Sequence, residues 1–105
     1  MAKILAAADI GSNTAHLLVG ATDGDIVMRI DNMNEWIPLG EVVAKAGTIP
    51  KEYIDQLVGA VKEFRKVAGG KKANALYVFA TEAMRSAKNH KDVLKRIKQE
   101  TGVSV

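Results

Sequence analysis

The chain has 105 residues, a length suited to one domain or to part of one. Hydrophobic residues make up 48% and charged residues 26%, as in ordinary soluble globular proteins, and the net charge is only +3; there is no cysteine, which excludes disulfides and thiolate zinc sites. No apolar run approaches the roughly 20 residues of a membrane span, and the short apolar start is interrupted too soon by Asp9 to form a signal peptide, so we expect a cytoplasmic protein that does not enter a membrane.

Three strands are predicted at the start of the chain. Residues 3–10 carry apolar side chains on both faces, which favours a central strand covered on both sides. Residues 14–21 form the second strand, and the pair Asp23-Gly24 marks a hairpin turn into a third strand over residues 26–31. The chain is therefore expected to open as an antiparallel meander.

Between the first two strands lie one carboxylate, one glycine and three small polar side chains: Asp9, Gly11, Ser12, Asn13 and Thr14. Gly11 permits a tight turn and the close approach of a ligand. The N–H groups that follow can point into one concavity, which usually binds phosphate. Asp9, at the end of the strand, is placed to hold Mg²⁺ or its waters. The composition leaves a second interpretation open, because a turn that only reverses the chain favours the same residue types.

The middle of the chain is the hardest part to interpret. Residues 32–48 show no clean hydrophobic period. The stretch 38–40, Pro-Leu-Gly, indicates a turn, and residues 41–46 fit either a short helix or a covering loop. We expect Trp36, the only tryptophan, to cap the core rather than to bind a ligand.

A long amphipathic helix is predicted to start at Pro50, where the missing N–H of proline has no consequence. Glu52 in the first turn complements the helix dipole. One apolar stripe is expected to face the sheet, formed by Ile54, Leu57, Val58, Val61 and Phe64. The pair Gly69-Gly70 is expected to end the helix.

The last third of the chain alternates strand and helix. Residues 73–80 form a strand that follows a helical crossover and should therefore run parallel to an earlier strand. Residues 82–87 fit a short helix or a turn. Residues 89–92 open a second amphipathic helix, which Gly102 ends. Residues 103–105 look like the start of a further strand. We therefore expect an unfinished α/β sheet with the order β-β-β-α-β-α.

The densest basic cluster lies in the second of these helices. Its lysines and arginine, within residues 91–98, are interleaved with apolar residues at helical spacing, which is typical of the solvated side of a helix. Aromatic residues make up only 5% of the chain, so no base-stacking platform accompanies this cluster. We therefore expect no nucleic-acid partner.

Two stretches resemble the motifs of a known family. Residues 9–14, Asp-Ile-Gly-Ser-Asn-Thr, followed by Ala-His-Leu-Leu-Val, are similar to the first phosphate loop of the exopolyphosphatase and guanosine pentaphosphate phosphohydrolase family. Residues 79–89 resemble the strand-to-helix motif of that family, with its fixed points at Thr81, Arg85 and Asn89. The resemblance covers nearly all of the chain, and the two motifs in this order are more specific than either one.

The resemblance implies a ribonuclease H-like fold of the actin-like ATPase, sugar kinase and Hsp70 group. Residues 1–105 would be a single, truncated N-terminal lobe of a two-lobed enzyme, with substrate in the cleft between the lobes. The family removes terminal phosphate from polyphosphate or from guanosine pentaphosphate, usually with Mg²⁺. By the resemblance, Asp9 would serve the metal, Arg85 would reach the polyanion, and the phosphate would be cradled by Gly11, Ser12, Asn13 and Thr14. Arginine suits this role because its planar fork binds oxygens in pairs.

Several positions depart from the family pattern or stay ambiguous. Pro38 stands where members commonly carry a basic residue. His16 stands where many members have arginine, and it either contacts phosphate or is a hydrogen-bonded strand histidine. Glu82 can pair with Arg85 or with Mg²⁺, and Thr81 is either a helix cap or a ligand. Without the resemblance, Arg85 would be interpreted as a solvated helix residue.

By the resemblance, the glutamate that activates water, the second phosphate loop and the second lobe would lie beyond Val105. We therefore expect this chain alone to hydrolyse nothing. Two functions follow: a phosphohydrolase represented by a fragment, or a non-catalytic half-lobe that binds phosphate or depends on a partner. The apolar edge of an unfinished sheet would also favour homo-oligomers.

Overall fold

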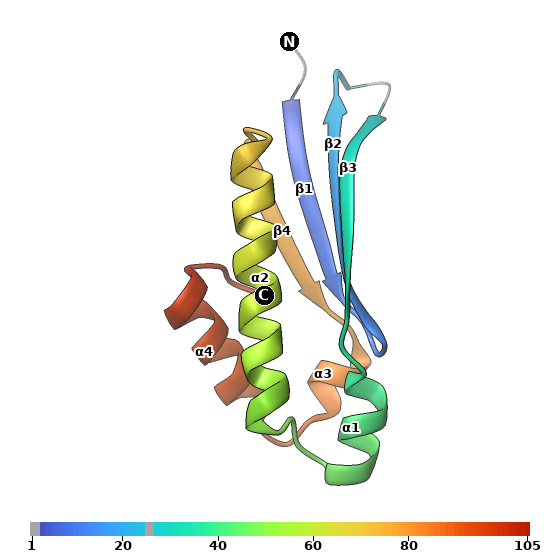
Figure 1. Cartoon of the computed structure of the whole chain (residues 1–105), viewed down its shortest axis with the longest axis vertical. Helices are drawn as coiled ribbons and strands as arrows, with labels where there is room; N and C mark the ends of the chain where they lie inside the picture. The colour runs from blue at the N-terminus through green and yellow to red at the C-terminus, as the bar shows by residue number, and fades with distance from the viewer. Residues whose placement is uncertain (1–2, 25–26) are drawn as a thin grey trace.

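The structure is a computed structural model that describes residues 3–24 and 27–105. Its elements in chain order are β1 (Lys3–Ile10), β2 (Thr14–Thr22), β3 (Val27–Trp36), α1 (Leu39–Ala46), α2 (Lys51–Gly70), β4 (Ala75–Ala80), α3 (Glu82–Ser86) and α4 (His90–Thr101). Figure 1 shows an elongated molecule with the sheet on one side, α2 and α4 on the other, and α1 and α3 together at one end.

The sheet has the strand order β3-β2-β1-β4. β1 pairs antiparallel with β2 and parallel with β4, and β2 pairs antiparallel with β3. The prediction of an antiparallel opening and of a parallel strand after the helical crossover is therefore confirmed. Because β1 and β4 are parallel, both strands end at the same edge of the sheet. This edge carries the two sequence motifs.

One face of the sheet forms the core with the helices. The buried side chains of β1 and β2 on this face are Ala6, Ala8, Ile10, Ala15, Leu17 and Val19, and α2 covers them with Leu57, Val61 and Phe64. The predicted apolar stripe of α2 is thus confirmed, apart from Ile54, which is only half-buried. The alternation of side chains along each strand places every second residue on the opposite face.

The expectation that both faces are covered is wrong for the described residues. Tyr77 and Phe79 of β4 are 54% and 58% exposed on the face away from α2. A shallow apolar groove of about 220 Å³ runs along this face beside Tyr77, and it is lined mainly by Leu5, Ala7, Leu18, Gly20 and Thr22. The sequence correctly predicts that this face is apolar. Within the described part of the chain, however, no helix or strand covers it.

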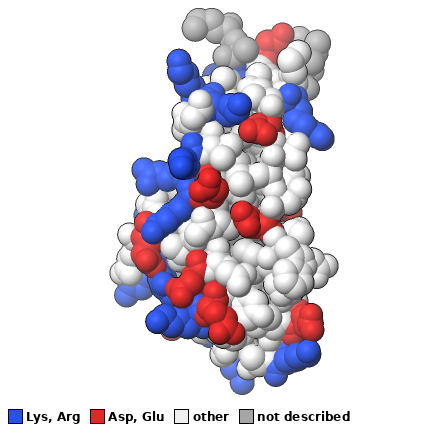
Figure 2. Space-filling view, viewed as in Figure 1, with Lys and Arg blue, Asp and Glu red and all other residues white. Residues whose placement is uncertain are grey.

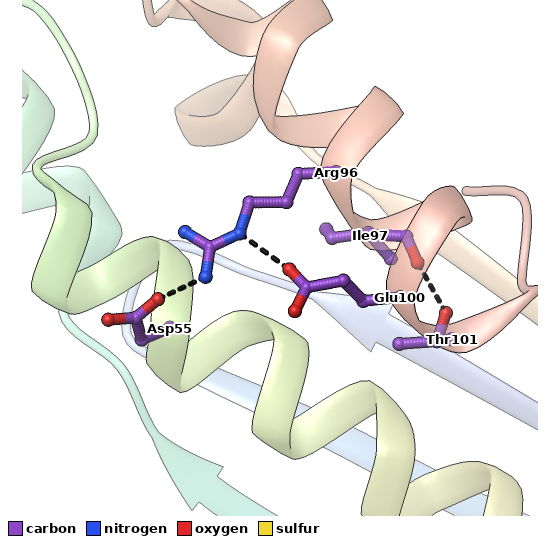
Figure 3. Close-up of polar contacts among 5 residues, drawn as sticks. All are labelled: Asp55, Arg96, Ile97, Glu100 and Thr101. Carbon is purple, nitrogen blue, oxygen red and sulfur yellow. Dashed lines mark hydrogen bonds and ion pairs between the residues drawn. The ribbon is translucent and has the colours of Figure 1, made fainter.

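α4 is tied to α2 by an ion-pair network (Figure 3). Arg96 donates to Asp55 of α2 and, over 2.5 Å, to Glu100 of its own helix. These acceptors, Glu100 first and then Asp55, raise the pKa of Arg96 above its usual value. Near the end of the helix, the hydroxyl of Thr101 donates to the carbonyl of Ile97 over 2.6 Å.

The lysines of α4 lie on its outer side, as predicted, whereas Arg96 is half-buried and pairs with α2. Lys91, Lys95 and Lys98 are exposed, whereas Val93 and Ile97 are fully buried. Figure 2 shows that the lysines and arginines of the helical side are interleaved with acidic side chains. No helix in the described part of the chain has the length and apolar character needed to cross a bilayer.

β3 is longer than the sequence indicates. A strand is predicted over 26–31, but β3 continues to Trp36 and pairs with the whole of β2. The free edge of β2 provides hydrogen-bond partners for these residues. They therefore form a strand although their sequence shows no alternation of apolar and polar side chains. Trp36 is 72% exposed, so the expectation that it caps the core is wrong. Asp25 and Ile26, which belong to the predicted turn and strand, lie outside the described residues.

The helix ends and the C-terminal residues also differ in detail. α1 already begins at Leu39, so the last two residues of the stretch predicted as a turn are helical and Pro38 is the N-cap. α2 includes Gly70, and the chain reverses instead at Lys72, which adopts a φ of 59°. Gly102 ends α4 as predicted, with a φ of 77°. Residues 103–105 do not form a strand, so that expectation is wrong for this structure.

Candidate functional site

The loop formed by residues 11–14 connects β1 to β2 at the edge where β4 also ends. The N–H of Gly11 donates to the carbonyl of Thr14 over 2.9 Å and closes the turn. This N–H is therefore engaged within the loop. The N–H groups of Ser12 and Asn13 have no hydrogen-bond partner among the described residues, and both residues are exposed. These two donors are the part of the predicted cradle that stays available to an anion.

The first turn of α1 and the segment before it hold this loop on one side. The N–H of Gly40 donates to the carbonyl of Ser12 over 2.8 Å, and that of Ile37 donates to the carbonyl of Asn13 over 3.0 Å. A Cβ added at Gly40 would lie 2.9 Å from the Cβ of Ser12, closer than such atoms approach. The glycine therefore allows the first turn of α1 to contact the loop directly.

The segment between β4 and α3 contacts the last residue of β1, directly before this loop. Thr81 donates its N–H and its hydroxyl to the carbonyl of Ile10, each over 3.1 Å. The two sequence motifs thus meet at the last residue of β1. Thr81 occupies the N-cap position of α3, but its side chain makes no capping hydrogen bond. Its hydroxyl donates to Ile10 of β1 instead, a role that neither sequence interpretation included.

Arg85 lies in α3, one helical turn beyond Thr81. Its Nη2 is 3.3 Å from Oε2 of Glu82, and the two side chains are 63% and 81% exposed. The structure thus shows the first of the two partners considered for Glu82. Arg85 also lines a groove of about 290 Å³ beside β4, together with Phe79 and Val105. The second motif therefore contacts the end of β1 next to the loop, while the guanidinium of Arg85 pairs with the exposed carboxylate of Glu82.

Asp9 and His16 are direct neighbours across β1 and β2, on the face away from α2. Asp9 is exposed and His16 is half-buried, and the next residue across the sheet is Asn34. Side chains that are directly opposite in this way have Cβ atoms about 5 Å apart. The ring of His16 makes no hydrogen bond to a described residue. The structure therefore does not support the alternative of a hydrogen-bonded strand histidine.

The chemistry of Asp9 fits Mg²⁺. This ion usually keeps several waters and binds through one or two carboxylates plus substrate phosphates. Within residues 3–24 and 27–105, no group of three or more His, Cys, Asp or Glu side chains is arranged to hold a metal. A magnesium ion at Asp9 would therefore take most of its other ligands from the phosphate and from water.

Asn89 has a role that sequence reasoning did not assign, although the second motif included it as a fixed point. Its Oδ1 accepts from the N–H of Ile49 and its Nδ2 donates to the carbonyl of Ile49, each over 2.9 Å. This pair of bonds joins the α1–α2 connection to the α3–α4 connection. Position in the motif was the only signal for this residue, because its partner is 40 residues away along the chain.

Comparison with known proteins gives consistent matches. The profile of the Ppx/GppA phosphatase family matches residues 21–105. Exopolyphosphatase 1 of Mycobacterium tuberculosis H37Rv is 39% identical over 98 residues, covering 92% of this chain and 28% of that protein. Exopolyphosphatase 1 of Mycobacterium leprae is 40% identical over 96 residues, covering 90% and 28%. The chain therefore spans about 28% of the length of these curated relatives.

Solved structures match the fold over the whole chain. The crystal structure of the Aquifex aeolicus member of the Ppx/GppA family gives a TM-score of 0.94 at 28% identity, covering 100% of this chain and 34% of that one. An exopolyphosphatase from Cytophaga hutchinsonii gives 0.90 at 27% identity, covering 98% and 33%. These matches confirm the predicted fold class, a mixed α/β sheet of the actin-like ATPase type.

Proposed function

The chain belongs to the Ppx/GppA phosphatase family, and we propose that it binds the terminal phosphates of polyphosphate or of guanosine pentaphosphate as part of an exopolyphosphatase-type hydrolase. The observation that carries the proposal is the meeting of the two motifs at the carbonyl of Ile10, which Thr81 holds with two hydrogen bonds. This contact places the loop of residues 11–14 beside the start of α3. Loop and helix thereby form one edge of a phosphate site.

The loop supplies neutral donors to the phosphate. The N–H groups of Ser12 and Asn13 are exposed and have no partner among the described residues, so an anion can accept from both. The hydroxyl of Thr14, also exposed, adds a donor of adjustable direction. Phosphoryl transfer requires mainly positioning and charge neutralisation, and fixed backbone donors provide the positioning.

Arg85 supplies positive charge. To bind phosphate, its guanidinium exchanges the carboxylate of Glu82 for phosphate oxygens, which it can bind in pairs. This exchange is inexpensive because the pair with Glu82 is largely exposed and such pairs contribute at most about 1 kcal/mol. Glu82 thus keeps Arg85 near the start of α3 until an anion arrives.

Asp9 would hold Mg²⁺, which when bound neutralises charge on the phosphate oxygens. The carboxylate is exposed near the end of β1, one residue before the loop, so Asp9 would be available to hold a magnesium ion beside the phosphate. His16 lies opposite Asp9 on β2 and faces the same side of the sheet. We propose that it adds a ring N–H to the phosphate.

Titration of the ¹⁵N-labelled chain with tripolyphosphate, with and without Mg²⁺, tests this proposal. We expect the largest amide shifts at Ser12 and Asn13 and tighter binding with Mg²⁺. Asp9→Asn should remove the effect of Mg²⁺ on affinity, whereas Asp92→Asn, an exposed aspartate in α4, should leave it unchanged. Shifts confined to the lysines of α4 would instead show non-specific attraction and would overturn the proposal. A parallel titration with guanosine pentaphosphate compares the two substrates.

A further inference from the structure

We infer that Asn89 is a positioning residue for the loop of residues 11–14: it fixes the distance between α1 and α3, whose first residues hold that loop. The inference deepens the proposed function and rests on it for the identity of the ligand. Asn89 itself lies at the opposite ends of these helices and touches no loop residue by a hydrogen bond. Its effect on the loop must therefore pass through α1 and α3.

Asn89 makes two hydrogen bonds with the backbone of one residue, Ile49, and we call this contact the clamp. Its amide accepts from and donates to the backbone of Ile49, which is 1% exposed. Beside it, the N–H of Lys88 donates to the carbonyl of Gly47 over 2.9 Å. Three hydrogen bonds thus join residues 47–49 to residues 88–89. A partly buried contact of this kind is directional and leaves unsatisfied groups when it is broken.

The loop and the clamp lie at the two ends of the same pair of helices. α1 contains Gly40, which donates to Ser12, in its first turn, and its C-cap is Gly47, which lies beside the clamp. α3 starts after Thr81, which holds Ile10, and leads to Asn89. Figure 1 shows α1 and α3 side by side below the end of β1.

The two helices are in contact, and each buries side chains in the core. Leu39 and Val43 of α1 are 0% and 8% exposed, and Met84 of α3 is 0% exposed. Packing of this density transmits displacements instead of absorbing them. A displacement at the clamp is therefore expected to move α1 and α3 and, through them, the loop.

α1 and α3 contribute to the position of the loop, in addition to the strand pairing on either side of it. Among the described residues, the hydrogen bonds that join residues 10–14 to the segments flanking α1 and α3 come from Ile37, Gly40 and Thr81. If α1 and α3 move apart at the clamp, the donors at Gly40 and Thr81 move relative to each other. The carbonyls of Ser12 and Ile10 follow, and the N–H of Asn13, which shares a peptide plane with the carbonyl of Ser12, changes its direction.

Asn74 offers a matched control for Asn89. Its Oδ1 accepts from the N–H of Ile4 over 2.9 Å, and its own N–H donates to the carbonyl of Ile4. The same type of side chain thus makes one exposed bond to the backbone at the beginning of β1, the end of the strand away from the loop. Asn89→Ala and Asn74→Ala should both lower the melting temperature.

The two variants separate when the loop itself is measured. In the ligand-free protein, Asn89→Ala should shift the amide resonances of Ser12 and Asn13, and Asn74→Ala should not. Tripolyphosphate affinity should fall about tenfold in Asn89→Ala, which corresponds to about 1.4 kcal/mol, and stay unchanged in Asn74→Ala. Asn89→Asp keeps the acceptor for Ile49 and should lie in between, and it serves as the test if the alanine variant does not fold.

Unchanged loop resonances and unchanged affinity in the folded Asn89 variants would overturn the inference. Equal changes in the Asn74 and Asn89 variants would also overturn it, because they would indicate general destabilisation. Failure of the proposed function looks different: the wild-type chain would then not bind tripolyphosphate, while Asn89→Ala would still shift the loop resonances and the positioning role would stand.

Discussion

Thr81 donates two hydrogen bonds, from its N–H and from its hydroxyl, to the single carbonyl oxygen of Ile10, which lies 71 positions earlier in the chain. The parallel pairing of Ala80 with Ile10 brings these residues to the same edge of the sheet. Long-range contacts of this kind explain how a loop with few apolar residues keeps a defined position.

We predict that Thr81→Val lowers the free energy of unfolding by about 1 kcal/mol, because valine keeps the shape of threonine but loses one partly buried hydrogen bond. The bond from the N–H of residue 81 should persist. Urea denaturation measures the effect. Thr48→Val is the control, since the Thr48 hydroxyl donates to no described residue, and it should change stability by less than about 0.5 kcal/mol.

We predict opposite effects for two glycine-to-alanine substitutions within helices. Gly40→Ala places a Cβ 2.9 Å from the Cβ of Ser12, so the loop or α1 must move, which should destabilise the fold by about 1–3 kcal/mol. A Cβ at Gly59, on the exposed side of α2, would meet nothing within 4 Å. Gly59→Ala should therefore stabilise by roughly 0.5–1 kcal/mol. Two variants with equal stability would contradict the close approach of α1 to the loop.

The elements with a strong local signal could be predicted from the sequence. The strand β1, the helices α2 and α4 and the parallel direction of β4 follow from periodicity and from the length of the crossover. The extension of β3 to Trp36 could not be predicted, because these residues adopt strand geometry only by pairing with β2.

The same distinction holds for the candidate site. The polar turn at residues 11–14 and its position at a strand end are visible in the sequence. That the N–H of Gly11 is consumed within the turn, and that Thr81 holds Ile10, depend on atoms that only the folded chain brings together. The role of Asn89 belongs to this second class, since its partner Ile49 carries no polar side chain that could indicate the contact.

We predict that Arg85 and Glu82 affect phosphate binding in opposite directions. Arg85→Ala should weaken tripolyphosphate binding about tenfold, since a hydrogen bond to a charged group contributes about 1.5–3 kcal/mol. Its effect on stability should be less than about 0.5 kcal/mol, because the side chain is 63% exposed. Glu82→Gln removes the competing carboxylate and should strengthen binding by roughly twofold to fivefold.

Isothermal titration calorimetry measures tripolyphosphate binding by Arg85→Ala and by Glu82→Gln. Arg29→Ala is the control, because Arg29 is an exposed arginine of β3 that pairs with β2 far from the loop. Equal losses in Arg85→Ala and Arg29→Ala would show that only net charge matters. The assignment of Arg85 as a phosphate ligand would then be wrong.

We predict that the chain self-associates through the sheet face that α2 leaves open. Tyr77, Phe79 and the groove beside Leu5 and Leu18 form an apolar surface, and exposed surfaces of this kind favour association. Tyr77→Lys places a charge in the middle of this surface. Because Tyr77 is already 54% exposed, the substitution should change stability little.

Sedimentation equilibrium should show a concentration-dependent mass for the wild type and a monomer for Tyr77→Lys. Gln56→Lys adds the same charge on the exposed side of α2 and should associate like the wild type. If Tyr77→Lys and Gln56→Lys have the same mass at every concentration, association does not involve this face.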